Sequence, residues 1–188
     1  MKKSIILTLV LAVSSLCAAN DIPEKLMALH PSNEKVTCGF TEVRVMPKVK
    51  KSETREGNLV YQAPDDLRMD YTSPAGDYIL ITADKMEQCK KGKTQSVRVK
   101  NRENRYTVYR ATLLSCLAGD IERAAELNDA KAECKKSGNK YVCTITSDDA
   151  KSKEIKQIQL EYDATTGRVL MITLTEGNGN YAVYTTHF

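Results

Sequence analysis

The feature that most constrains the fold of this chain is an alternation of apolar and polar residues that begins at Val36. It is clearest at Leu67, Met69 and Tyr71, where each apolar residue is followed by a polar one. A period of two predicts a strand with one face against a core and the other in water. Further strands are expected around Leu59 and Tyr61, at Tyr78–Ala83, around Val97 and Val99, and in a closing meander of Tyr141–Thr146, Ile155–Tyr162, Val169–Glu176 and Tyr181–Phe188. Because Tyr78–Ala83 is apolar on both faces, we expect it to be a central strand covered from both sides.

Three segments with apolar residues three and four positions apart predict short amphipathic helices. The first begins at Asp21 and is stopped by Pro31. The second covers Arg105–Ala118 and ends at a capping glycine, and the third begins at Asp120 as its N-cap. The sequence therefore predicts one large, mostly antiparallel sheet with three helices available to cover one of its faces.

A hairpin is expected at Ser137–Lys140, because Gly138 in the first of two central positions is typical of a type II′ turn. Counting outward from this turn pairs Cys134 with Cys143 at a site that lacks mutual hydrogen bonds, where Cα atoms lie ~4.5 Å apart. A disulfide fits that spacing, so we predict a Cys134–Cys143 bridge. The pairing of the other cysteines is left open at Cys38, Cys89 and Cys116.

The first residues have the layout of an export signal. Lys2 and Lys3 precede an apolar run from Ile5 to Leu16, and small residues follow up to Ala19. This pattern predicts a signal peptide over residues 1–19, cleavage after Ala19, and a soluble single domain over residues 20–188. The alternative is lipidation at Cys17, which requires a small residue at the position that Leu16 occupies.

Charge and motif content exclude several classes of function. Lysine and arginine number 28 against 24 acidic residues, and the lysine runs at 48–51 and 90–93 lack interleaved aromatic residues, so nucleic acid is not an expected partner. The two histidines, His30 and His187, are poorly placed as a catalytic base, and no phosphate-loop or metalloprotease motif occurs. We therefore predict no enzyme activity, no cofactor and no metal site, and we expect Cys116 to be a buried inert thiol.

Four stretches taken together resemble the LolA family of periplasmic lipoprotein carriers: Phe40–Glu42, Glu56–Pro64, Leu67–Pro74 and Tyr78–Asp84. The family pattern contains Phe-Thr-Gln, Gly-x-Leu-x-Val-x-Arg-Pro, an aromatic-rich strand ending in proline, and an apolar strand ending in Asp-Gly. The match is concentrated in residues 36–84. The resemblance implies an α+β fold, an incomplete antiparallel β-barrel with short helices covering its concave apolar face.

The resemblance also implies a function. Such carriers take acylated lipoproteins from inner-membrane release machinery, shield the acyl chains while crossing the periplasm, and deliver them to an outer-membrane acceptor. We therefore expect a periplasmic monomer whose partners are lipoproteins or other lipids. Its expected acyl cavity comprises Leu59, Tyr61, Leu67, Met69, Tyr71 and Leu80, with Leu113, Leu114 and Leu117 on the helix that forms the lid.

Two matters stay open. The same apolar residues could fill a closed core instead of lining a cavity, and a related half-barrel could serve as an envelope sensor or interaction module that binds a protein partner. The chain also departs from the family pattern. Ala63 stands where the family has the arginine that helps to latch the lid, so the latch is either different or absent, and Met69 stands where the family often has tryptophan.

Overall fold

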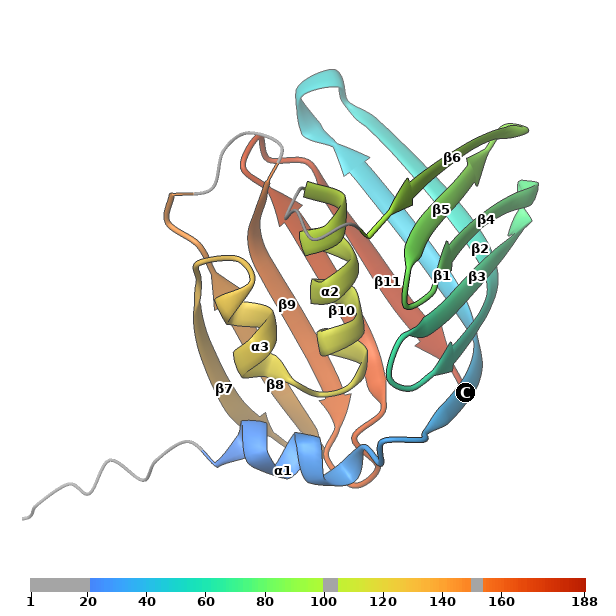
Figure 1. Ribbon diagram of the computed structural model, residues 1–188. Helices are drawn as coiled ribbons and strands as arrows, with labels where there is room; N and C mark the ends of the chain where they lie inside the picture. Colours follow the sequence, from blue (N-terminus) through green and yellow to red (C-terminus); the bar gives the residue numbers. More distant parts are fainter. Residues whose placement is uncertain (1–20, 100–104, 150–153) are drawn as a thin grey trace, which may run out of the picture.

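The computed structural model describes residues 21–99, 105–149 and 154–188, so the expected signal peptide lies outside the described residues. Eleven antiparallel strands form one sheet in the order β6-β5-β4-β3-β2-β1-β11-β10-β9-β8-β7. The sheet curves around the helices but stays open between its edge strands β6 and β7 (Figure 1). The expected α+β fold, an incomplete barrel with short helices, is confirmed.

The first half of the sheet consists of β1 (Lys35–Met46), β2 (Lys51–Gln62), β3 (Asp66–Ser73), β4 (Ala75–Ile81), β5 (Lys85–Lys90) and β6 (Lys93–Arg98). The second half consists of β7 (Lys131–Ser137), β8 (Lys140–Thr146), β9 (Ile155–Asp163), β10 (Val169–Glu176) and β11 (Tyr181–His187). The helices are α1 (Ile22–Leu29), α2 (Arg105–Leu117) and α3 (Ile121–Glu126), with a short 3-10 turn at Pro47–Val49.

The two halves are joined through β1 and β11, which are far apart in the sequence. They pair antiparallel from Gly39 opposite His187 to Val45 opposite Tyr181. Between β6 and β7 the chain crosses the concave face as α2 and α3 (Figure 1). The buried apolar residues lie between these helices and the sheet.

Two strand expectations need correction. The β4 segment is a strand, but its residues Tyr78 and Leu80 are only half-buried. One of its faces is therefore only partly covered, whereas both faces were expected to be covered. Strand β5 was not expected, because Lys85–Lys90 shows no clear alternation of apolar and polar residues. It forms because β4 and β6 pair with it on either side.

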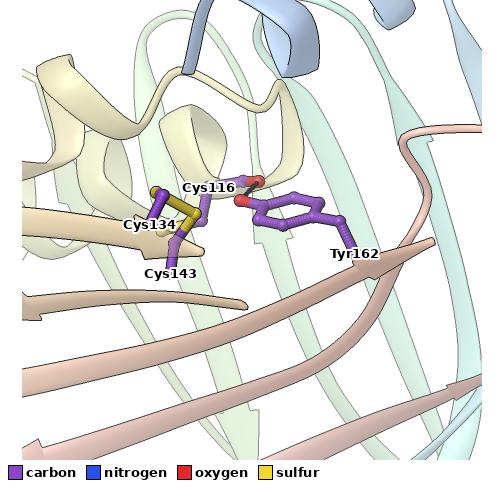
Figure 2. The surroundings of a disulfide bond; sticks show 4 residues. All are labelled: Cys116, Cys134, Cys143 and Tyr162. Carbon is purple, nitrogen blue, oxygen red and sulfur yellow. Dashed lines mark hydrogen bonds between the residues drawn. A yellow bond between two sulfur atoms is a disulfide. The ribbon is translucent and has the colours of Figure 1, made fainter. Parts of the chain in front are cut away.

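The disulfide prediction is confirmed. Cys134 pairs with Cys143 across β7 and β8 with a Cα separation of 4.1 Å, and their sulfur atoms are bonded. Figure 2 shows this bridge near Cys116, whose carbonyl oxygen accepts a hydrogen bond of 2.7 Å from the hydroxyl of Tyr162. The three cysteines that were left open are free and buried: Cys38, Cys89 and Cys116.

His30 follows α1 and fixes it to the rest of the domain. Its Nδ1 lies 2.6 Å from Oε2 of Glu34, and its Nε2 lies 2.9 Å from the carbonyl oxygen of Gly167. The ring also packs on Gly119, where an added Cβ would lie 2.8 Å from Cδ2 of His30. Gly119 ends α2 with φ at +71°, as expected for the C-cap.

We predict that Gly119→Ala destabilises the domain more than Gly138→Ala. Both glycines have positive φ, but an added Cβ at Gly138 meets nothing within 4 Å. The control should cost ~1–2 kcal/mol of unfolding free energy from backbone strain. Gly119→Ala should cost about 1–3 kcal/mol more from crowding against His30. Urea denaturation measures both, and equal losses would contradict the packing of His30 against Gly119.

Candidate functional site: an apolar cavity beneath α2

A cavity of about 30 Å³ lies between α2 and the concave face of the sheet. Its walls come from both halves of the sheet and from the helix: Phe40, Leu59, Leu67, Met69, Ile79, Tyr109, Leu113, Leu117, Val169, Ile172, Tyr184 and Thr186. A water molecule needs ~10–15 Å³ by this kind of measure, so the cavity has room for about two. The space beneath α2 is therefore nearly filled by side chains.

A second pocket of about 20 Å³ adjoins the first. The two share Leu59, Leu117, Val169 and Thr186 as wall residues. We refer to these two neighbouring pockets together as the apolar path beneath α2; Leu117 is the residue of this helix that lines both. Tyr109 and Tyr184 line the larger pocket and not the smaller one, whereas His30, Arg168 and Phe188 line the smaller pocket and not the larger one.

Eight of the nine residues expected in the acyl cavity fall into three groups. The larger cavity is lined by Leu59, Leu67, Met69, Leu113 and Leu117, whereas Tyr61 lines only the smaller pocket. Tyr71 and Leu114 are buried in the same core but line neither pocket. The structure thus brings most of the expected set together beneath α2.

Leu80 was placed on the wrong face. It pairs with Arg68, whereas Met69 of the same strand pairs with Ile79. Because neighbours across a sheet share a face, Leu80 points away from the cavity and Ile79 points into it. The strand is apolar at both positions, so its own sequence does not identify the inner one. A register shift between Asp70 and Thr72 moves the pairing by one residue. Counting outward from Thr72 opposite Ala75 without this shift pairs Leu67 with Leu80, so the turn alone does not identify Ile79.

Further cavity residues were also missed, namely Phe40, Tyr109, Val169, Ile172 and Tyr184. Those of β10 and β11 reach the cavity only because these strands curve toward α2. No local pattern distinguishes them from other inward-facing residues of the meander.

α2 is held to the sheet by its own arginine. Nε and Nη2 of Arg110 donate to the carbonyl oxygen of Thr82 at 2.9 and 2.6 Å, and Nη2 lies 3.4 Å from Oδ1 of Asp65. The Arg110 side chain is about 10% exposed. The helix is thus latched although Ala63 replaces the arginine of the family pattern, since the guanidinium comes from the helix instead of the sheet.

A buried network of charged groups lies beyond the tyrosine end of the cavity. Nη2 of Arg55 donates to Oδ2 of Asp77 at 2.6 Å, and Nη1 lies 3.5 Å from Oε2 of Glu42. Tyr71 donates to the same Glu42 oxygen at 2.7 Å, and its ring lies beneath the Arg55 guanidinium at 3.6 Å. Two carboxylates and one guanidinium are thereby buried together.

Tyr184 links this network to the cavity wall and to α2. Its hydroxyl donates to Oε1 of Glu42 at 3.3 Å and is hydrogen-bonded to Tyr109 of the helix. Arg44 completes the charge balance, with Nε 3.4 Å from Oε1 of Glu42. Burial, followed by the nearby Glu42 charge, raises the pKa of Tyr71 above its ordinary value. The phenol therefore keeps its proton and acts as a donor.

Groups that could support catalysis have structural partners. His187 lies 2.9 Å from the hydroxyl of Thr41, and His30 is held by Glu34 and Gly167. Burial raises the pKa of Cys116 to about 12, so its thiol is un-ionised near neutral pH. Among the described residues no three histidine, cysteine or acidic side chains are grouped to hold a metal, and no helix there is long and apolar enough to cross a bilayer.

No protein-family model matches this chain, and no curated protein does. Solved structures that are similar include a LolA superfamily protein of Nitrosomonas europaea, at 12% identity over 90% of this chain and 91% of that one, with a TM-score of 0.41. A domain of Vibrio parahaemolyticus assigned to outer membrane lipoprotein sorting has 11% identity over 88% of each chain and a TM-score of 0.44.

Another similar structure is the MucA/MucB complex of Pseudomonas aeruginosa, at 14% identity, 88% of this chain, 54% of that chain and a TM-score of 0.42. The first two structures carry the family description that the sequence resembles. At this level of similarity none of them indicates a ligand or a partner for this chain. Its function is therefore argued below from its own side chains.

We predict that Arg55→Met is strongly destabilising, because it leaves Glu42 and Asp77 buried without their cation. Removing one member of a buried ion pair typically costs ~3–5 kcal/mol. The control is Arg68→Met, which breaks an exposed pair with Asp70 and should cost less than about 1 kcal/mol. Thermal and urea unfolding of both variants test this. Similar losses would show that the buried network contributes little.

Proposed function

We propose that this protein is a periplasmic carrier that shields acyl chains of lipoproteins or other lipids beneath α2 and delivers them toward the outer membrane. The observation that carries the proposal is the apolar path between α2 and the concave sheet, with walls from both halves of the sheet. No catalytic step is part of this function. The domain of residues 20–188, the cleaved signal peptide and the monomeric state belong to the same proposal.

The energetics of acyl transfer support a carrier of this form. A chain of roughly 14 methylenes at ~0.8 kcal/mol each represents about 11 kcal/mol of transfer free energy out of water. Ligand pockets usually enclose ~300–1,000 Å³, far more than the present cavity. Loading therefore requires α2 to move away from the sheet.

The way α2 is attached supports such a movement. Arg110 latches it near its midpoint, and Gly119 at its C-terminal end packs on His30. Between them, Leu113 and Leu117 face the cavity and make apolar contacts that an acyl chain could replace. Opening beneath the helix would then exchange one set of apolar contacts for another.

The disulfide supports export. A Cys134–Cys143 bridge forms and persists in oxidising compartments such as the bacterial periplasm. The proposed partners are acylated lipoproteins or lipids, inner-membrane release machinery and an outer-membrane acceptor. The interaction-module alternative places the partner at a sheet edge or on the convex face, away from the apolar path.

The cavity can be tested by filling it. We predict that Met69→Phe weakens binding of a fluorescent long-chain fatty acid methyl ester at least fivefold, because the added ring occupies space beneath α2. The control is Leu80→Phe on the uncovered face of the neighbouring strand, which should bind like the parent protein. Circular dichroism verifies that both variants fold.

Equal binding by both variants, or no binding by the parent protein, would contradict the proposal that this protein carries acyl chains beneath α2. A pull-down from envelope extracts that recovers one regulatory protein instead of varied lipoproteins or lipids would favour the interaction module.

The latch gives a separate kinetic prediction. Arg110→Met removes the two hydrogen bonds to Thr82, so α2 should open more often and the ester should load several-fold faster in stopped-flow fluorescence. Arg123→Met is the control, because this arginine is an exposed residue of α3 whose side chain pairs with Glu126 of its own helix. An unchanged loading rate for Arg110→Met would show that α2 is not the gate.

A further inference from the structure

The charged side chains that line the two pockets all belong to the smaller one. Of the described residues that line the two pockets, Arg168 is the single arginine or lysine. It lies immediately before β10, is exposed, and its guanidinium stands 4.8 Å from the ring centre of Phe188. This contact holds a cation at the mouth of an apolar pocket.

The charge of Arg168 is not neutralised by an ion pair. Within the described ranges no carboxylate lies within 4.0 Å of its guanidinium. The nearby carboxylate of Asp163 accepts hydrogen bonds from the backbone of Thr165 and Thr166 at 3.0 and 2.8 Å, and the positive charge of Arg168 acts on it only from a longer distance. It also accepts from the amide of Asn139 at 3.1 Å.

The histidine and the carboxylate in this pocket are paired with each other. His30 lies between Glu34 and the carbonyl oxygen of Gly167, with its Nδ1 2.6 Å from Oε2 of Glu34. Arg168 is therefore the charged side chain of the pocket wall for which the described residues provide no ion pair within 4.0 Å.

The opposite end of the path differs. Arg44 and Arg55 lie there beyond Tyr184, but the carboxylates of Glu42 and Asp77 balance them. Among the described residues, the path therefore has an exposed arginine without an ion pair at one end and mostly apolar walls behind it.

We propose that the ligand is an amphiphile with a singly acylated or diacylated tail and an anionic head group, carboxylate or phosphate, which Arg168 binds while the tail lies beneath α2. This inference rests on the proposed acyl-carrier function and narrows its cargo. The acyl chains of a lipoprotein anchor are attached to a neutral glyceryl thioether and an amide, so they offer Arg168 no anion. A free acidic lipid does, and it fits this end of the path better.

The test uses the mature protein and two probes with the same tail. One is cis-parinaric acid and the other is its uncharged methyl ester, and fluorescence titration gives the affinity for each. Arg168→Gln should weaken binding of the acid about tenfold. This loss of affinity is near the lower end of the range for a hydrogen bond to a charged group, because the arginine is exposed. Binding of the ester should change less than twofold.

Arg98→Gln is the matched control, because it removes the same charge from an exposed residue of edge strand β6. It should alter neither affinity, and Arg168→Lys should recover part of the lost binding of the acid. Competition distinguishes the head groups: lysophosphatidic acid should displace the acid better than monoacylglycerol if phosphate is accepted. Free inorganic phosphate should not compete, because it lacks the tail.

The results separate this inference from the function on which it rests. Binding of acid and ester with equal affinity, or equal losses for both in Arg168→Gln, would overturn the anionic head group and leave the acyl carrier intact. Binding of neither probe by the parent protein would overturn the acyl carrier and, with it, the role of Arg168.

Discussion

The rest of the structure depends on covering the concave face of a sheet that curves without closing. Over the part of the chain that the structure describes, eleven strands form this one sheet, and the apolar side chains of its inner face have no second sheet to pack against. α2 and α3 cover this face instead, with α1 at one end (Figure 1). A helix lying in a curved sheet contacts it less uniformly than a second sheet would. The space left beneath α2 is where the two pockets lie.

Polar contacts then determine where the helix is fixed. Arg110 attaches the middle of α2 to the end of β4, and Tyr109 joins it to the buried Glu42 network through Tyr184. The C-terminal end is positioned by close packing of Gly119 on His30. Between these attachments, Leu113 and Leu117 rest on apolar side chains. The exchangeable contacts above the cavity therefore belong to the second half of the helix.

Much of the fold could be predicted from the sequence, because the period-two pattern and turn residues act locally. The hairpin at Gly138 fixed the register that pairs Cys134 with Cys143, and the capping residues of α2 and α3 marked their ends. The site was less predictable. Leu80 is apolar like Ile79, and only the pairing with β3 decides which of them faces inward. Arg110 has no sequence signal that separates it from other arginines on a helix, because its partner, the carbonyl oxygen of Thr82, is brought to it only by the fold. Whether the apolar face forms a filled core or an open cavity depends on how closely α2 approaches the sheet.

The most direct test of the central claim is native mass spectrometry of the protein released from its own cell envelope without detergent. The proposed carrier should appear partly as a complex with one acylated molecule, and extraction of that complex should release a lipid or an acylated peptide. A protein that remains ligand-free after release, and after incubation with envelope lipids, would contradict the claim that the space beneath α2 opens to hold an acyl chain.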